Sequence, residues 1–163
     1  MIVRKAREED IREISEIAVE DWKKAYRGII DSDYLDSLSI ENQYQKDLQR
    51  YHEYMVAADR NGILGFSWNR TIDTEAADCE IVALYVRFTE RKKGIGRALL
   101  NNTVDAFRKA GKKSLIIWCL KENAEARKFY EKTGGILYGI GSHRWGGREY
   151  DLVSYLYDCS GSN

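Results

Sequence analysis

Residues 84–100 (LYVRFTERKKGIGRALL) constrain the fold of this chain more than any other stretch. The stretch begins as the end of an apolar strand, crosses a short charged turn and continues as an amphipathic helix. Its turn carries the motif Arg91-x-x-Gly94-x-Gly96, where glycines permit a tight turn or the close approach of another group. A strand that leads directly into a long helix is typical of a parallel strand–helix–strand unit, which requires a right-handed crossover.

The same turn predicts a binding site for an anion. Four cations, Arg91, Lys92, Lys93 and Arg97, lie within seven residues. The first turn of a helix also offers unpaired N–H groups and a partial positive charge, which favours a phosphate-bearing ligand. Two common phosphate motifs do not fit, because no Gly-Lys-Ser/Thr follows and the three-glycine dinucleotide spacing is absent. A glycine turn with a solvated basic surface stays open as the alternative.

Composition limits the partners and the compartment. The 26 basic and 26 acidic residues balance, which argues against nucleic acid as the main partner. No apolar run approaches the length of a membrane span, and the N-terminus lacks a signal-peptide pattern. Cys79, Cys119 and Cys159 contain no C-x-x-C pair, which favours a reducing compartment over a disulfide framework or a zinc site. We therefore expect a cytoplasmic protein with one domain over residues 1–158 and a disordered tail over 159–163.

Hydrophobic periodicity predicts the remaining elements. Expected helices cover residues 8–26, one or two segments within 33–52, 94–110 and 123–133; expected strands cover 2–6, 54–59, 63–71, 79–86, 114–120, 136–140 and 150–156. Asn61-Gly62 predicts a hairpin turn, and residues 141–148 are expected to form a loop around Trp145. One parallel crossover combined with antiparallel hairpins predicts a mixed α/β fold. Its core would be a central twisted sheet of about seven strands with helices on both faces.

A second motif follows the turn about 30 residues later: Asn123-x-x-Ala126-x-x-Phe129-Tyr130-x-Lys132-x-Gly134. In this order the two motifs resemble the GNAT superfamily of acetyl-CoA-dependent N-acetyltransferases, and the resemblance covers nearly the whole chain. One departure is Phe88, where family members often carry proline, and it bears on the rigidity of the loop. The resemblance implies a sheet that splays between its fourth and fifth strands, with the acetyl-CoA thioester in the slot and no metal.

The resemblance also assigns cofactor-binding residues. It implies that backbone amides from Lys92 to Arg97 hold the pyrophosphate of coenzyme A, and that strand residues before the turn pair with the pantetheine arm. Asn123 is either a helix cap or a group near the pantetheine, and both roles are compatible. The expected cofactor-binding residues are Leu84, Tyr85, Val86, Arg91, Lys92, Lys93, Gly94, Ile95, Gly96, Arg97 and Asn123.

Two residues are candidates for proton transfer. Tyr130 is either a core tyrosine or, as the resemblance implies, the general acid that protonates the departing thiolate. Glu80 interrupts an apolar strand, so it must face solvent, a cation or a cleft. It is a candidate general base, directly or through water, because neutralising a lysine-like amine at pH 7 costs about 4–5 kcal/mol. Asp78 is a weaker candidate, and Cys119 in its apolar strand is expected to be a small hydrophobe rather than a nucleophile.

Trp22, Tyr26 and Tyr34 are either packing aromatics or the wall of the acceptor pocket, as the resemblance implies. We expect an N-acetyltransferase in which a primary amine of a small molecule or peptide attacks the thioester directly. A transferase for longer acyl-CoA and a catalytically silent acyl-CoA-binding module are the alternatives. The sequence does not identify the acceptor, and a homodimer is expected only from family habit.

Overall fold

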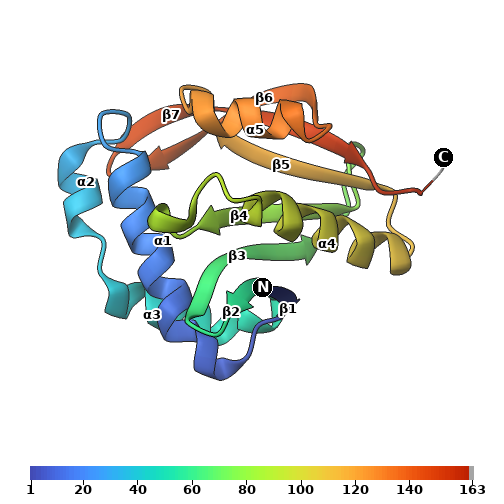
Figure 1. Ribbon diagram of the computed structural model, residues 1–163. Helices are drawn as coiled ribbons and strands as arrows, with labels where there is room; N and C mark the ends of the chain where they lie inside the picture. Colours follow the sequence, from blue (N-terminus) through green and yellow to red (C-terminus); the bar gives the residue numbers. More distant parts are fainter. Residues whose placement is uncertain (162–163) are drawn as a thin grey trace.

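The computed structural model describes residues 1–161, and its centre is a seven-stranded sheet in the order β1-β2-β3-β4-β5-β7-β6 (Figure 1). The β4–β5 pair is parallel, and all other neighbours are antiparallel. The strands are β1 (Ile2–Lys5), β2 (Tyr54–Asp59), β3 (Gly62–Thr71), β4 (Cys79–Val86), β5 (Ser114–Leu120), β6 (Ile136–Trp145) and β7 (Arg148–Asp158). The mixed α/β fold predicted from the sequence is confirmed.

Within residues 1–161, five α-helices and three short 3₁₀ helices connect the strands. They are η1 (Glu8–Asp10), α1 (Ile11–Ala25), α2 (Ser32–Ser37), α3 (Ile40–Arg50), η2 (Tyr51–Glu53), η3 (Phe88–Glu90), α4 (Ile95–Lys109) and α5 (Ala124–Lys132). Periodic apolar positions explain the two long helices, since Ile11, Ile14 and Ile17 of α1 and Leu99 and Leu100 of α4 are buried. The two helices bury these faces on opposite sides of the sheet.

Two hydrophobic clusters show the helices on both faces. On one face, Ile14 and Ile17 of α1 pack with Tyr54, Val56 and Phe66. On the other, Leu100 of α4 and Tyr130 of α5 pack with Ile81, Ile117 and Tyr155. Each face therefore has its own core, and the sheet lies between them.

A register shift in β4 coincides with the splay of the sheet. Trp68 pairs with Ala83 but Asn69 pairs with Ile81, so Val82 is an extra residue on β4, which is a β-bulge. The parallel ladder between β4 and β5 ends at the same place, at Ile81 and Ile117. Figure 1 shows the two strands diverging beyond this point. The expected splay between the fourth and fifth strands is confirmed.

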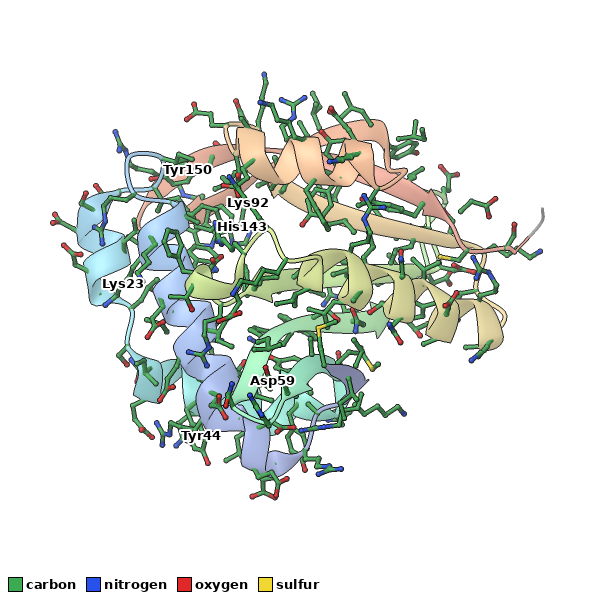
Figure 2. All side chains as sticks on the ribbon, viewed as in Figure 1. Lys23, Tyr44, Asp59, Lys92, His143 and Tyr150 are labelled. Atoms are coloured by element: carbon green, nitrogen blue, oxygen red, sulfur yellow. The ribbon has the colours of Figure 1, made fainter. Side chains whose placement is uncertain are left out.

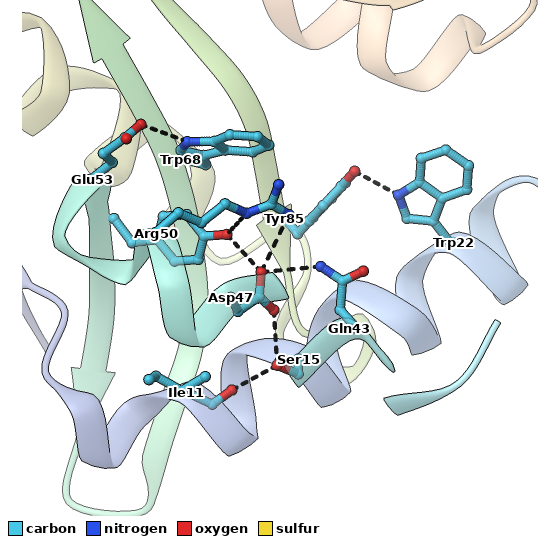
Figure 3. Close-up of polar contacts among 10 residues, drawn as sticks. Ile11, Ser15, Trp22, Gln43, Asp47, Arg50, Glu53, Trp68 and Tyr85 are labelled. Atoms are coloured by element: carbon cyan, nitrogen blue, oxygen red, sulfur yellow. Dashed lines mark hydrogen bonds and ion pairs between the residues drawn. The ribbon is translucent and has the colours of Figure 1, made fainter. Parts of the chain in front are cut away.

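The helix α3 is fixed to the α1 face by a buried carboxylate (Figure 3). Asp47 is completely buried and accepts hydrogen bonds from the hydroxyls of Ser15 at 2.8 Å and Tyr54 at 2.6 Å. Gln43 and Arg50 donate to Oδ1, the oxygen that also accepts from Tyr54, at 3.0 and 3.4 Å, whereas Ser15 donates to Oδ2. Since a buried charge needs such partners, the network specifies how α1, α3 and β2 pack together.

Two details differ from the expectations. The loop expected over residues 141–148 is instead the continuation of β6 and β7 to a two-residue turn, Gly146–Gly147, with φ of 60° and 79°. Cys159, expected in a disordered tail, is fully buried, and its N–H donates to the carbonyl of Lys113 at 2.8 Å. Residues 162–163 of that expected tail lie outside the described residues.

Candidate active site

A cleft of about 1250 Å³ occupies the gap where β4 and β5 separate. Sites for drug-sized ligands are usually about 300–1000 Å³, so the volume suits a large cosubstrate together with an acceptor. The cleft is lined by every residue expected from the sequence to bind cofactor or acceptor or to transfer protons, with the exceptions of Lys93, Tyr34 and the weaker candidate base Asp78. Figure 2 labels two residues of its lining, Lys92 of the turn and His143 of β6.

The turn before α4 has the backbone of an anion site. Gly94 is the N-cap residue with φ of 83°, and no side chain caps the helix, so the first amides of α4 lack a side-chain acceptor. Lys92 is the one non-glycine residue among 1–161 with positive φ, at 63°. Gly96 serves packing, because a Cβ there would lie 3.3 Å from the Phe129 ring of α5. Unpaired amides, positive dipole and a left-handed backbone together favour a phosphate.

The four cations of this turn have different partners. Arg91 is bonded to the buried Asp21 of α1 and lies 3.7 Å from Glu125 of α5, so it joins two helices across the cleft. Lys93 pairs with Glu90 at 2.9 Å. Lys92 and Arg97 have no ion pair within the described part of the chain, which leaves them available to an anion. Burial raises the pKa of Asp21, although Arg91 acts in the opposite direction.

Tyr130 lies on the buried face of α5 and lines the cleft. Burial raises the pKa of its phenol well above the ordinary value, so the group is protonated at neutral pH, as a general acid must be. Asn123 caps the same helix, since its side chain accepts from the N–H of Ala126 at 3.1 Å. Asn123 also lines the cleft together with Tyr26, so it combines the capping role with a position in the cleft.

Glu80 lies where β4 and β5 are still paired, opposite Ile116. Its side chain is only 13% exposed and forms an ion pair with Arg70 of β3 at 3.0 Å. The bulge at Val82 places Glu80 on the same face of β4 as Tyr85, because Glu80 pairs with Arg70 and Tyr85 with Phe66. Asp78 is a poorer base, since hydrogen bonds from the amides of Ser114 and Lys113 lower its pKa.

The side of the cleft that the sequence predicts for the acceptor is aromatic. Trp22 contacts Tyr26 with ring centroids 4.8 Å apart and Trp145 at 5.3 Å. Tyr34 lies behind Trp22, with centroids 6.4 Å apart, and does not reach the cleft itself. Trp145, expected in a loop, stands at the end of β6 and lines the cleft.

The sequence did not single out Asp21, Arg70, Trp118 or His143 as site residues, although all four line the cleft. Asp21 had a signal, because it follows Ile17 and Ala18 at the spacing of the buried helix face. The other three become neighbours only through strand register, which sequence periodicity does not determine.

A family comparison agrees with this geometry. Residues 11–135 match the model of the acetyltransferase (GNAT) family. The chain therefore belongs to this family, and its enzyme class is acyltransferase.

Individual relatives are consistent with that assignment. The N-acetyltransferase YuaI of Bacillus subtilis, itself uncharacterised, is 33% identical over 125 residues, 74% of this chain and 72% of YuaI. A spermidine N(1)-acetyltransferase of Thermoplasma acidophilum is 27% identical over 142 residues, 81% of this chain and 86% of the relative.

Solved structures share the fold. The PaiA N-acetyltransferase of Thermoplasma acidophilum, solved with coenzyme A, superposes with a TM-score of 0.77 at 23% identity, covering 96% of this chain and 98% of that one. YncA of Salmonella typhimurium, solved with acetyl-CoA, gives 0.72 at 19% identity, covering 99% and 95%.

Within residues 1–161, no helix is both long and apolar enough to span a bilayer. No three His, Cys, Asp or Glu side chains gather as a metal site in that range.

Proposed function

We propose that this protein transfers the acetyl group of acetyl-CoA to a primary amine of a small molecule or peptide, by direct attack in a ternary complex. One observation carries the proposal: the uncapped turn before α4, Tyr130 and Glu80 all line the same cleft between the splayed strands. Bound acetyl-CoA would supply the activated thioester. The chain itself would bind the pyrophosphate at the amides following Gly94.

The two proton-transfer groups would act at opposite ends of the reaction. Glu80 accepts a proton from the acceptor's ammonium group, either directly or through water, because only the free amine is nucleophilic. Tyr130 donates its phenolic proton to the sulfur as the C–S bond breaks. Burial raises the pKa of the Tyr130 phenol well above its ordinary value, and the same dry cleft also disfavours a charged thiolate, so the proton can pass from the phenol to the sulfur. A covalent acetyl-enzyme is not needed, since burial raises the pKa of Cys119 to about 11.

Calorimetric titration with acetyl-CoA, followed by thiol release with a panel of amines, tests the proposal. Saturable binding and amine-dependent thiol release are expected. Binding without thiol release across the panel would identify a silent acyl-CoA-binding module, and the absence of binding would contradict the proposal altogether.

The proposal includes a reducing, cytoplasmic location and a homodimer. All three cysteines are free thiols, which supports the location.

For the dimer, the edge strand β6 exposes Ile136 (71%), Tyr138 and Ile140 (84%), and a long apolar edge is a site for pairing with another chain. Sedimentation velocity of wild type and Ile140→Lys tests this, with a loss of the dimer expected in the variant.

A further inference from the structure

The ion pair of Arg70 and Glu80 lines the cleft, and each side chain has a polar atom without a hydrogen-bond partner among the described residues. Glu80 uses only Oε2, which accepts from Nε and Nη2 of Arg70 at 3.1 and 3.0 Å. Within residues 1–161, Oε1 of Glu80 and Nη1 of Arg70 make no hydrogen bond or ion pair. Among residues 1–161, Oδ1 of Asn69 is the only side-chain oxygen or nitrogen that is both buried and without a hydrogen-bond partner. Oε1 of Glu80 also lacks a partner in this range, so it must be accessible to solvent. The pair thus offers an open carboxylate oxygen next to an open guanidinium nitrogen.

These two atoms match the charges of one chemical group. An α-amino acid carries an ammonium and a carboxylate on the same carbon, so its ammonium suits Glu80 and its carboxylate suits Arg70. Guanidinium is the side chain best adapted to a carboxylate, and a charge-assisted hydrogen bond is about twice as strong as a neutral one. A simple amine would satisfy Glu80 alone, and a polyamine would also place further positive charge beside Arg70.

The other carboxylates of the cleft also disfavour a polycation. Among the described residues, Asp21, Glu80 and Glu125 are the three carboxylates in the lining. Asp21 and Glu125 both face Arg91, and Glu80 faces Arg70. Each negative charge is therefore already opposed by an arginine, and no pair of free carboxylates is left for a second ammonium group.

Trp118 provides a surface for the rest of the acceptor. Ile116 of β5 pairs with Glu80, and Trp118 is two residues further along, so both point to the Glu80 face of the sheet. The ring of Trp118 lies over β6, because a Cβ at Gly141 would come within 3.1 Å of it. Trp118 and Gly141 line the cleft and Trp118 is only partly buried, which leaves ring surface for an apolar or aromatic side chain.

We propose that the acceptor is a free α-amino acid with an apolar or aromatic side chain, bound by Arg70 and Glu80 and packed on Trp118; this rests on the proposed acetyl transfer. The ammonium loses one proton to Oε1 of Glu80, and the free amine attacks the thioester carbon. The N–C bond forms as the C–S bond breaks, the thiolate takes the Tyr130 proton, and the nitrogen releases its second proton to solvent.

The test compares L-phenylalanine with 2-phenylethylamine, which lacks only the carboxylate, and with spermidine, by thiol release from acetyl-CoA. We expect kcat/KM for phenylalanine to exceed that for 2-phenylethylamine at least tenfold, a difference of about 1.4 kcal/mol. Arg70→Gln should remove this preference, mainly by raising the KM for phenylalanine. Arg12→Gln is the matched control, because Arg12 forms an exposed ion pair with Glu41 outside the cleft and should keep the preference.

A second readout does not depend on turnover. Titration of L-phenylalanine into the protein saturated with coenzyme A should show binding in wild type and Arg12→Gln, with at least tenfold weaker binding in Arg70→Gln. Equal use of 2-phenylethylamine, preference for spermidine, or an equal loss with every acceptor in Arg70→Gln would overturn the inference. Failure of the proposed function is recognised separately, because acetyl-CoA would then either not bind or release no thiol with any amine of the panel.

Discussion

The indole N–H of Trp22 donates to the hydroxyl of Tyr85 at 2.6 Å, so α1 is bonded directly to the strand that forms one side of the cleft (Figure 3). Tyr85 also packs against Phe66, with ring centroids 5.5 Å apart. Burial raises the pKa of Tyr85 well above its ordinary value, so its hydroxyl remains neutral. The proposed acceptor wall and the proposed pantetheine strand are therefore joined by one hydrogen bond.

Tyr85→Phe should disturb the acceptor more than the cosubstrate. The ring and its packing remain, but the Trp22 N–H loses its partner, at a cost of about 1–3 kcal/mol. We expect a several-fold higher KM for the accepted amine and little change in acetyl-CoA affinity, measured by steady-state kinetics and calorimetry. An unchanged KM with weaker acetyl-CoA binding would show that the bond supports the cofactor side instead.

Tyr130→Phe should reduce catalysis without reducing binding. The substitution removes only the hydroxyl, and a positioned general acid contributes about 10²–10⁴ in rate. We expect kcat to fall within this range while the calorimetric affinity for acetyl-CoA changes little. Tyr157→Phe is a useful control, because its hydroxyl bonds the Tyr130 carbonyl and not the reacting groups. A Tyr130→Phe enzyme with wild-type kcat would exclude the phenol as the acid.

Glu80→Gln should produce a defect that depends on pH. At neutral pH the acceptor amine is mostly protonated and needs a base, whereas at high pH it is already deprotonated. Activity should therefore be lost most strongly near pH 7 and partly recovered toward pH 9, as measured in a pH–rate profile with one accepted amine. A profile that matches wild type from pH 6 to 9 would assign the base to water or to another group.

Gly96→Val should abolish acetyl-CoA binding in a protein that still folds. A Cβ at Gly96 already lies 3.3 Å from Phe129, so a larger side chain pushes α4 away from α5 and displaces the proposed anion site. Gly111→Ala is the matched control at the other end of α4. Its φ of 82° strains the backbone, but nothing lies within 4 Å, so acetyl-CoA affinity should persist. Wild-type affinity in folded Gly96→Val would remove the pyrophosphate assignment.

The thiol of Cys119 should react slowly with alkylating reagents. Because burial raises its pKa to about 11, the thiolate fraction at pH 8 is about 10⁻³, and it increases only as the pH rises toward that value. Iodoacetamide labelling followed by mass spectrometry should find little modification at pH 8, and Cys119→Ala should retain most activity. A trapped acetyl group on Cys119 would contradict direct transfer.

The sequence predicted most of what depends on local pattern. The helix after Gly94 and the cap at Asn123 follow from glycine, capping and apolar spacing, and the structure has both within a residue of the expected bounds. Tyr130 and the turn were located by motif resemblance, and their chemical roles stay predictions. The extension of β6 was missed because Ser142, His143 and Arg144 are polar. That polarity reflects an exposed strand and not a loop.

The contacts that depend on pairing could not be predicted. Arg91 looks like a free cation in the sequence, and only the packing of α1 against the turn brings Asp21 to it. Arg70, Glu80 and Trp118 come from three strands, so their meeting requires the register of β3, β4 and β5. A shift of one residue in any of these strands would send its side chain to the other face.

The extra residue at Val82 has a consequence for protein engineering. An added residue shifts the alternation of side chains between the two faces of a strand. A β4 segment that spans the bulge therefore cannot be replaced by the segment of a relative that lacks it. Deleting Val82 would remove the bulge, and Glu80, Ala83 and Tyr85 would stay on one face in regular alternation, but β4 would lose its irregularity at the place where its ladder with β5 ends. Grafts that alter acceptor preference must therefore conserve the length of β4, and single-residue gaps aligned at this position should be treated as functional differences.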